Sequence, residues 1–379
     1  MITLADIGSL QSHNSAITRW AKFGPYYAMF PIDFAFEVVE KYSSLGDYII
    51  DPFAGRCSSI YAGGILGRNS LGIEINPLGW LYGTVKLSPA PKQEVIDRLL
   101  DIYNKRVDYK YHAEQMPEFF QICYCPEVLQ FLLSARSNLD WENNSTDGTL
   151  MSILLVYLHG KLGEGLSNQM RQTKAMGVNY SINWWKSKNM SVPPTIEPLS
   201  FIMKKIEWRY AKDIPPIYTN CGVVFGDSTL ELEEIIKKSK QEKIKYSLLF
   251  TSPPYWSIVD YHADQWLRLW LLGGETFPKS NEDKHKRRFN SKVDYQNLLQ
   301  SVFSNCAEVM AKKSTIFVRT DAREFTFQTT LEVLTSCFPK HKVTINKEPF
   351  KKKTQTELFN GSAKPSEKFG EIDIILERF

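Results

Sequence analysis

Residues 48–75 combine two short apolar runs with a helix-like stretch, and this alternation constrains the fold more than any other feature of the sequence. The run 48–51 is compact, apolar and bounded by turn residues, which predicts a short buried strand. Residues 58–66 have mostly small side chains and predict a helix, and residues 70–75 predict a second strand. A strand, a helix and a strand in this order form a βαβ unit, whose parallel strands need a right-handed crossover. We therefore expect an α/β sheet.

The β/α alternation stops after residue 89 and returns near residue 216. Between these positions the apolar spacing is helical, and a segment of about 120 residues is too long for an ordinary loop. We therefore expect a discontinuous sheet domain at residues 1–90 and 216–379, interrupted by a helical insertion at residues 91–215. The later strands are expected at 222–225, 246–250 and 315–319, with a helix around 230–238 and a closing antiparallel pair at 343–346 and 372–376.

The composition excludes several classes of protein without selecting one. Of the 379 residues, 43% are hydrophobic, so the chain can bury a sizeable core. The longest apolar run, about 153–158, is far shorter than the ~20 residues of a membrane span, and residues 1–10 show no secretory signal. Six cysteines without zinc spacing argue against disulfides and a structural metal. We expect a cytoplasmic protein without a metal, and the net charge of +4 is too small to identify a nucleic-acid binder.

The loop 51–57 follows the first predicted strand, at the end of the strand where α/β sheets bind ligands. Gly55 lets the backbone approach a ligand closely because it has no Cβ. Glu74 ends the next strand 19 residues later, which is typical of an acidic residue that accepts hydrogen bonds from ribose hydroxyls. The glycine fingerprint of a pyrophosphate site and a P-loop lysine are both missing, which favours an adenosine cofactor without phosphates. Taken singly, Gly55 also suits a tight turn, and Glu74 a solvated strand end.

A second motif, Thr251-Ser252-Pro253-Pro254-Tyr255, follows the predicted strand 246–250. Its prolines fix two φ angles and push the residue before each into an extended conformation, so the motif forms a rigid tip. The exocyclic amine of a base is a poor nucleophile because its lone pair is conjugated. Acceptors at the Ser252 hydroxyl and the Pro253 carbonyl would favour a pyramidal nitrogen, and Tyr255 would stack on a base swung out of its helix. A simple proline turn is the alternative.

Together these residues resemble the amino-methyltransferase family of S-adenosylmethionine-dependent DNA modification enzymes. The tip begins with Ser252, as is usual in the branch that methylates N4 of cytosine, whereas Asp or Asn is usual in the N6-adenine branch. The resemblance covers residues 20–90 and 220–275 and, more weakly, the final strands. The matching segments are the cofactor loop 51–55, the ribose strand end 72–77, the acidic motif 226–228, residues 22–25 with 30–31, the tip 251–255, and residues 260–261 with 270–273.

The resemblance implies a Rossmann-like class I methyltransferase sheet, mostly parallel with an antiparallel closing strand, and an inserted helical subdomain. It implies S-adenosyl-L-methionine as cofactor and site-specific transfer of a methyl group to N4 of a flipped-out cytosine. Double-stranded DNA and a cognate restriction endonuclease are the implied partners. N6-adenine methylation, methylation of an RNA amino group and a degenerate DNA-binding module are the alternatives. The implied catalytic residues are Ser252, Pro253, Pro254 and Tyr255, and the implied cofactor-binding residues are Phe30, Asp51, Phe53, Gly55, Glu74, Asn76, Asp227 and Ser228.

The cofactor loop departs from the family pattern after Gly55. The family usually continues with Gly-Ser-Gly-Thr, whereas Arg56-Cys57-Ser58-Ser59 follow in this chain. Loss of the second glycine stiffens the loop and brings a bulky side chain near the carboxylate of the cofactor. We expect Arg56 either to pair with that carboxylate or to point to solvent.

Two short segments carry the basic excess of the chain. Residues 160–188 contain five basic residues and one acidic residue, interleaved with amides and rings, and residues 279–292 contain six basic and two acidic residues. Basic groups suit phosphates, amides suit base edges and rings suit stacking, so both segments predict contact with DNA. The alternative for 160–188 is a solvated helical face over an aromatic core. The predicted nucleic-acid-binding residues are Arg171, Lys174, Tyr180, Trp185, Lys186, Lys286, Arg287 and Arg288.

Overall fold

The computed structural model describes residues 10, 12–25, 30–217, 219–256, 261–278, 291–348 and 370–379. The predicted DNA contacts Lys286, Arg287 and Arg288 lie outside the described residues, as does most of the basic segment 279–292. Asp260, one of the residues on which the family resemblance rests, also lies outside the described residues.

The strands are β1 (Tyr48–Asp51), β2 (Asn69–Glu74), β3 (Cys221–Phe225), β4 (Tyr246–Thr251), β5 (Met310–Asp321), β6 (Lys342–Glu348) and β7 (Glu371–Arg378). They form one seven-stranded sheet with the order β3-β2-β1-β4-β5-β7-β6. The neighbours from β3 to β5 run parallel, and β7 lies antiparallel between β5 and β6. The predicted strands and the Rossmann-like sheet with an antiparallel closing strand are thereby confirmed.

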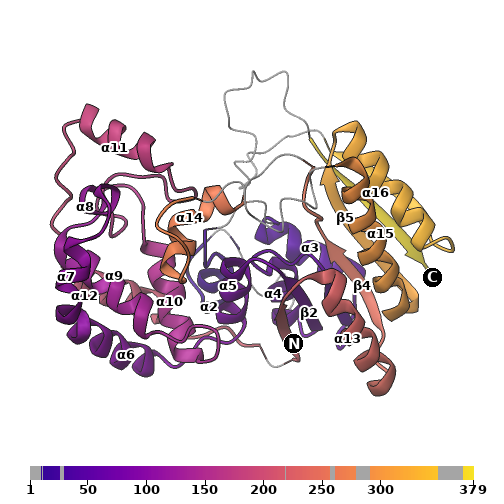
Figure 1. Ribbon diagram of the computed structural model, residues 1–379. Helices are drawn as coiled ribbons and strands as arrows, with labels where there is room; N and C mark the ends of the chain where they lie inside the picture. The colour runs from indigo at the N-terminus through magenta and orange to yellow at the C-terminus, as the bar shows by residue number, and fades with distance from the viewer. Residues whose placement is uncertain are drawn as a thin grey trace.

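The helices that flank the sheet are α2 (Ala16–Ala21), α3 (Ile32–Tyr42), α4 (Ser58–Ile65), α5 (Pro77–Leu87), α13 (Ser228–Glu242), α15 (Lys292–Val309) and α16 (Glu324–Cys337). They cover both faces, because successive residues of a strand point to opposite sides. In β4, Leu248 and Phe250 belong to the hydrophobic cluster on one face, and Leu249 belongs to the cluster on the other. Figure 1 shows α13, α15 and α16 along one side of the sheet and α4 and α5 on the other.

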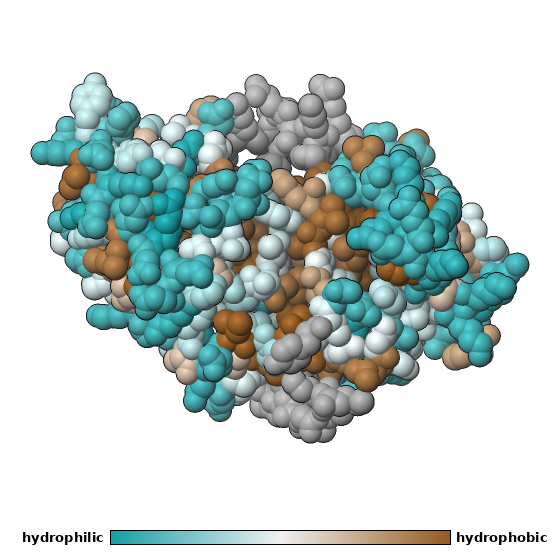
Figure 2. Space-filling view, turned by 90° about the horizontal axis from the view of Figure 1, so that it is seen from below, coloured by the Kyte–Doolittle hydropathy of each residue, from teal (hydrophilic) through white to brown (hydrophobic). Residues whose placement is uncertain are grey.

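The helices of residues 92–210, here called the helical lobe, are α6 (Lys92–Lys105), η1 (Arg106–Tyr109), α7 (Lys110–Glu114), α8 (Glu118–Cys123), α9 (Pro126–Asn138), α10 (Ser145–Tyr157), α11 (Val178–Ser187) and α12 (Pro198–Tyr210). The lobe shares a core with the sheet, since one hydrophobic cluster contains Phe250 of β4, Leu81 of α5 and Leu154 of α10. Figure 2 shows hydrophobic residues gathered in the middle of the lower face, between two more hydrophilic sides. The predicted helical character of the segment is confirmed, whereas its status as a separate domain at 91–215 stays a prediction.

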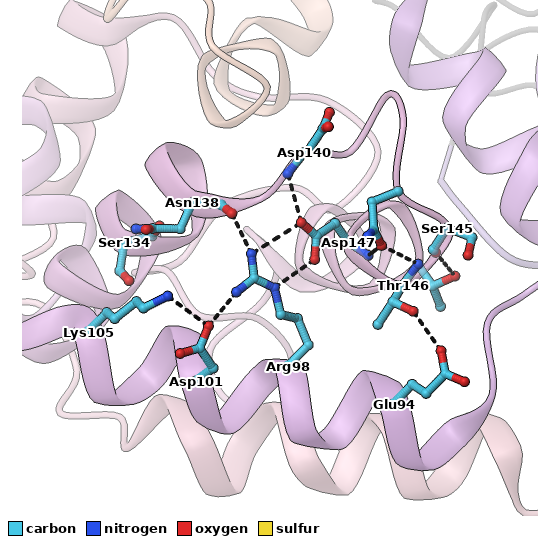
Figure 3. Close-up of polar contacts among 12 residues, drawn as sticks. Glu94, Arg98, Asp101, Lys105, Ser134, Asn138, Asp140, Ser145, Thr146 and Asp147 are labelled. Atoms are coloured by element: carbon cyan, nitrogen blue, oxygen red, sulfur yellow. Dashed lines mark hydrogen bonds and ion pairs between the residues drawn. The ribbon is translucent and has the colours of Figure 1, made fainter.

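An ion-pair network holds three helices of the lobe together (Figure 3). Arg98 of α6 donates from Nε to Oδ1 of Asp147 in α10 over 2.7 Å and from Nη2 to the carbonyl of Asn138, the last residue of α9. The Asp147 carboxylate also accepts a bond of 2.9 Å from the backbone N–H of Asp140. Because the Asp147 side chain is nearly buried, these partners stabilise its charge as well as the packing of the three helices.

Three further observations concern membranes, metals and thiols. Within the described ranges, no helix combines the length and the hydropathy that crossing a membrane requires. Across those same ranges, no group of three or more His, Cys, Asp or Glu side chains is arranged to hold a metal ion. All six cysteines are free thiols.

Candidate active site at the carboxyl edge of the sheet

Asp51, at the end of β1, ties the two predicted motifs together. Its Oδ1 accepts bonds from the Thr251 hydroxyl at 2.6 Å and from the backbone N–H of Phe53 at 3.1 Å, and its Oδ2 accepts a bond from the Ser59 hydroxyl. The side chain is buried, and burial raises the pKa of Asp51 to about 6 although the three hydrogen bonds lower it. Asp51 therefore fixes the start of the predicted catalytic tip against the predicted cofactor loop.

The cofactor loop folds back over the end of β2. Gly55 has a φ of +54°, a left-handed conformation that favours glycine, and its N–H donates to Oε2 of Glu74 over 2.6 Å. The N–H of Ala54 donates to the carbonyl of Ile73 over 3.0 Å. The loop thus lies directly on the strand end that carries Glu74, as the sequence predicts for a shared ligand site.

Both carboxylate oxygens of Glu74 accept a hydrogen bond within the protein, and each can accept one more. Oε2 accepts from Gly55, and Oε1 accepts from the backbone N–H of Asn76 over 2.8 Å. Each oxygen offers two lone pairs, so one acceptor position remains on each for another donor. Burial raises the pKa of Glu74 to about 8, and the two backbone bonds only partly offset it. Asn76 caps α5, because its Oδ1 accepts from the N–H of Leu78 at 3.0 Å.

The end of β3 joins the same edge. Asp227 caps α13 and accepts bonds from the N–H of Thr229 at 3.0 Å and from its hydroxyl at 2.8 Å. The hydroxyl of Ser228 donates to the carbonyl of Pro52, in the cofactor loop. The N–H of Gly226 donates to the Glu74 carbonyl over 3.0 Å. The ends of β1, β2 and β3 are therefore connected by direct hydrogen bonds.

Two exposed apolar residues at this edge were missed by the sequence analysis. Ile75 follows Glu74 and is 37% exposed, and Phe225 ends β3 and is 41% exposed. The Phe225 ring stacks on Trp80 with ring centres 5.1 Å apart. Apolar groups beside hydrogen-bonding carboxylates suit a flat, partly polar ligand. The sequence could have indicated both residues, because Ile75 directly follows Glu74 and Phe225 directly precedes the acidic motif 226–228.

The two predicted cofactor-binding phenylalanines pack mainly against other rings. Phe30 is buried, and its ring stacks on Phe250 at 4.4 Å. Phe53 is partly buried, with its ring edge toward Phe303 at 6.4 Å. Phe30 thus belongs to the core under β4, and Phe53 packs against the cluster on the opposite face of the sheet.

Arg56 is almost completely buried in the cofactor loop. It is 3% exposed, so the expectation that it points to solvent is wrong. Its Nη1 donates to the carbonyl of Gly24 over 2.9 Å, but Nε and Nη2 have no hydrogen-bond partner among the residues that the structure describes. The buried amino group of Lys86 lies close by and donates to the Arg56 carbonyl over 2.6 Å, and burial lowers the pKa of Lys86 well below its ordinary value. Burial lowers the pKa of Arg56 to about 10, and within the described residues no ion pair offsets the buried charge.

The predicted catalytic tip, residues 251–255, lies at the end of β4, and its tyrosine is hydrogen-bonded. The partly buried Ser252 hydroxyl donates to the Tyr255 hydroxyl over 3.5 Å. The Tyr255 hydroxyl donates in turn to Oε1 of Glu371, the first residue of β7, over 3.2 Å. Burial raises the pKa of Tyr255 well above its ordinary range. The sequence analysis missed Glu371, because nothing in its own strand marks it as part of the tip.

The predicted DNA contacts of the helical lobe are not alike. Arg171 is exposed and Tyr180 is 63% exposed, as a surface contact requires. Lys174 pairs with Asp264, and Lys186 pairs with Glu118 over 2.6 Å. Trp185 is fully buried, and its Nε1 donates to the carbonyl of Gln169 over 2.8 Å. The prediction that Trp185 contacts nucleic acid is wrong, because the ring is part of the core.

The segment that carries Arg171 and Lys174 is attached to α14 (Tyr261–Leu271), the helix after the catalytic tip. Within α14, Gln265 donates to the carbonyl of Thr173 over 3.1 Å, and Trp266 donates to the carbonyl of Met176 over 3.1 Å. Figure 1 shows α14 beside the helices of the helical lobe. The lobe and the tip are thus joined through one helix.

Comparison with known proteins finds short similarities to methyltransferases. No family model matches the chain. It is 33% identical over 85 residues to the type II methyltransferase M.MjaII of Methanocaldococcus jannaschii, which is 22% of this chain and 16% of that protein. It is 37% identical over 49 residues to the type II methyltransferase M.MthZI of Methanothermobacter thermautotrophicus, which is 13% of this chain and 14% of that protein. The matched stretches thus span less than a fifth of either relative.

Among solved structures, the chain resembles the rRNA methyltransferase aviRa from Streptomyces viridochromogenes. The two share 10% identity and a TM-score of 0.36, with 97% of this chain and 93% of that chain covered. The order and direction of the strands place the chain in the Rossmann-like class.

Proposed function

We propose that this protein is an S-adenosylmethionine-dependent methyltransferase that modifies N4 of cytosine in double-stranded DNA. The observation that carries the proposal is the hydrogen bond of 2.6 Å from Thr251 to Asp51, which joins the catalytic tip to the cofactor loop. A methyl donor on the loop and an amine at the tip would therefore meet at one edge of the sheet. The short similarities to two type II methyltransferases support the same chemistry.

The loop fits S-adenosylmethionine on its own geometry. Glu74 keeps an acceptor position on each oxygen, which suits the two hydroxyls of a ribose. Ile75 and Phe225 offer apolar surface for an adenine ring. Nε and Nη2 of the buried Arg56, which lack a hydrogen-bond partner within the described ranges, suit a carboxylate, which would also balance its charge. When bound, the cofactor supplies an electrophilic methyl group on a positively charged sulfur.

The tip fits an exocyclic amine. The Ser252 hydroxyl and the Pro253 carbonyl would accept hydrogen bonds from the two N–H groups, which favours a pyramidal nitrogen with an available lone pair. The two prolines hold these acceptors in place, because both φ angles are fixed. Ser252 at the start of the motif favours cytosine N4 over adenine N6 through the resemblance to the family.

The exposed Arg171 and Tyr180 support DNA as the substrate, since a guanidinium group suits a phosphate and a ring suits an unstacked base. A cognate restriction endonuclease is part of the proposal, and it rests on the similarity to type II methyltransferases alone.

The base is identified by mass. The protein is incubated with S-adenosylmethionine and unmethylated plasmid, the DNA is digested to nucleosides, and the methylated nucleoside is identified by mass spectrometry. The same reaction is run with structured RNA as the substrate. We expect N4-methylcytosine. N6-methyladenine alone would overturn the choice of base, modification of RNA alone would overturn DNA as substrate, and no methylated nucleoside from either would overturn the activity.

A further inference from the structure

A chain of hydrogen bonds leads from Ser252 of the tip to the first residue of β7. Ser252 Oγ donates to Tyr255 Oη over 3.5 Å, and Tyr255 Oη donates to Glu371 Oε1 over 3.2 Å. Both hydroxyl protons are thus directed toward the carboxylate. Resting on the proposed function, we propose that Ser252, Tyr255 and Glu371 form a proton relay that removes the proton of the methylated amine to Glu371.

The carboxylate is held in position by β5. Arg319 donates to Asp373 of β7 with two bonds, of 2.6 and 2.8 Å, and its Nη1 lies 3.6 Å from Oε2 of Glu371. The positive charge of Arg319 therefore lies on the side of Glu371 that Tyr255 does not use. This leaves Oε1 as the acceptor for the tyrosine proton.

The surroundings of Glu371 suit a proton acceptor. Its side chain is 12% exposed, enough to return a proton to solvent after each cycle. Its charged neighbours are Arg319 and Asp321 of β5 and Asp373 of its own strand, and Tyr255 faces it from the tip. Glu348 of β6 is its partner in the strand register. Burial raises the pKa of Glu371 above its ordinary range, and Arg319 partly offsets the rise.

Methyl transfer creates the proton that the relay removes. The lone pair of the amine nitrogen forms the bond to the methyl carbon, and the electron pair of the broken carbon–sulfur bond stays on sulfur, which becomes neutral. The nitrogen then carries a positive charge and must lose a proton. That proton passes to Ser252 Oγ while the serine proton passes to Tyr255 and the tyrosine proton passes to Glu371. The carboxylate becomes a neutral carboxylic acid, and both hydroxyl groups end unchanged.

A different role for Glu371 would be to hold the Tyr255 ring in place without moving a proton. The two roles differ in what they require of residue 371. A hydrogen-bond acceptor is enough to hold the ring, and glutamine provides one. A relay needs a group that can bind a proton, which glutamine cannot do but aspartate can.

The experiment compares Glu371→Gln and Glu371→Asp with the wild type and with Glu377→Gln, a matched control at the other end of β7. The rate of methyl transfer to plasmid DNA is measured from pH 5 to pH 9 with saturating cofactor, and cofactor affinity is measured by calorimetry. For Glu371→Gln we expect a rate near neutral pH lower by roughly 100-fold, the lower range for a lost proton transfer, and loss of the acidic limb of the pH profile. Glu371→Asp should keep that limb, and every variant should bind S-adenosylmethionine like the wild type.

Tyr255→Phe provides a second test in case Glu371→Gln fails to fold, and it should show the same loss of rate and of the acidic limb. A wild-type pH profile in Glu371→Gln or in Tyr255→Phe would overturn the relay while leaving the proposed function intact. Equal loss of rate in Glu371→Gln and Glu371→Asp with an unchanged profile would also overturn it, in favour of the holding role. A wild-type protein that transfers no methyl group to nucleic acid would overturn the proposed function, and the relay with it.

Discussion

The carboxyl edge of the sheet and the surface of the helical lobe both carry predicted functional residues, but at the edge several of them contact one another directly. At the edge, Asp51 contacts Thr251, Gly55 contacts Glu74, and Ser228 contacts the cofactor loop. In the lobe, the predicted residues are separately exposed, ion-paired or buried, and Trp185 lies in the core.

The difference follows from geometry. Parallel strands end at a common edge, so a residue just after one strand lies near a residue just after the next, however far apart they are in sequence. A helix offers no such rule, because the direction of each side chain depends on what packs against that helix. Position along the chain therefore predicts a site at the sheet edge better than it predicts a binding surface on a helical lobe.

The largest expected effect is at the catalytic tip. Ser252→Ala removes the hydroxyl proposed to accept the amine N–H, and we expect a rate of methyl transfer lower by about 100-fold or more, since one lost polar contact in the transition state has effects of this size. Cofactor affinity should be unchanged by calorimetry. Ser247→Ala, in β4, the strand that precedes the tip, is the matched control and should have the wild-type rate. If the Ser252→Ala protein were as active as the wild type, Ser252 would have no role in methyl transfer.

The second effect concerns the buried charge of the cofactor loop. Arg56→Met should weaken binding of S-adenosylmethionine by roughly 10- to 100-fold, because a hydrogen bond to a charged group contributes about 1.5–3 kcal/mol. The ligand-free protein should melt no lower than the wild type, since an unbalanced buried cation disappears.

Arg68→Met is the control for this change. Arg68 is also buried, but it lies before β2, and its guanidinium group donates to Ser43 and to the carbonyl of Leu66. We expect a lower melting temperature and unchanged cofactor affinity. If Arg56→Met bound S-adenosylmethionine with wild-type affinity, Arg56 would not contact the carboxylate of the cofactor.

The third effect is a pH dependence of stability. The folded protein holds the pKa of Glu74 at about 8, above the ordinary value for Glu, so between these two values the folded state binds more protons than the unfolded state. The free energy of unfolding should therefore fall as the pH rises through this window. Glu74→Gln, which resembles the protonated form, should narrow the difference in melting temperature between pH 5 and pH 9 by about 3–5 °C. If the difference in melting temperature between pH 5 and pH 9 were the same as in the wild type, Glu74 would be charged across this whole pH range.

The smallest effect is expected on the lobe. Arg171→Ala should weaken DNA binding a few-fold and reduce the slope of log affinity against log salt concentration by about 1, as expected for one lost phosphate contact. Lys237→Ala, an exposed lysine on α13, removes the same charge elsewhere and should leave the slope unchanged. Equal slopes in both variants would leave the lobe without a demonstrated role in binding DNA.

The sequence predicts many of the residues at the carboxyl edge of the sheet, but few of the residues that contact them from behind. Gly55 and Glu74 are identified by their position after predicted strands, and the structure joins them directly. Glu371 could not be predicted, because it reaches Tyr255 only through the antiparallel placement of β7. Arg56 had two expected positions, and its burial excludes the one in solvent, while the pairing with a carboxylate stays a prediction.

Trp185 shows the limit in the lobe. A tryptophan on an amphipathic helix suits both base stacking and core packing, and spacing alone does not separate the two. The hydrogen bond from its Nε1 to the carbonyl of Gln169 and its complete burial assign it to the core.

The central claim is that the carboxyl edge of the sheet is the cofactor site. A crystal structure of the protein with S-adenosylhomocysteine tests it most directly. We predict the ribose hydroxyls on Glu74, the adenine against Ile75 and Phe225, the carboxylate on Nε and Nη2 of Arg56, and the sulfur facing Ser252. A ligand bound elsewhere, or bound at the edge with Glu74 and Arg56 untouched, would contradict the account.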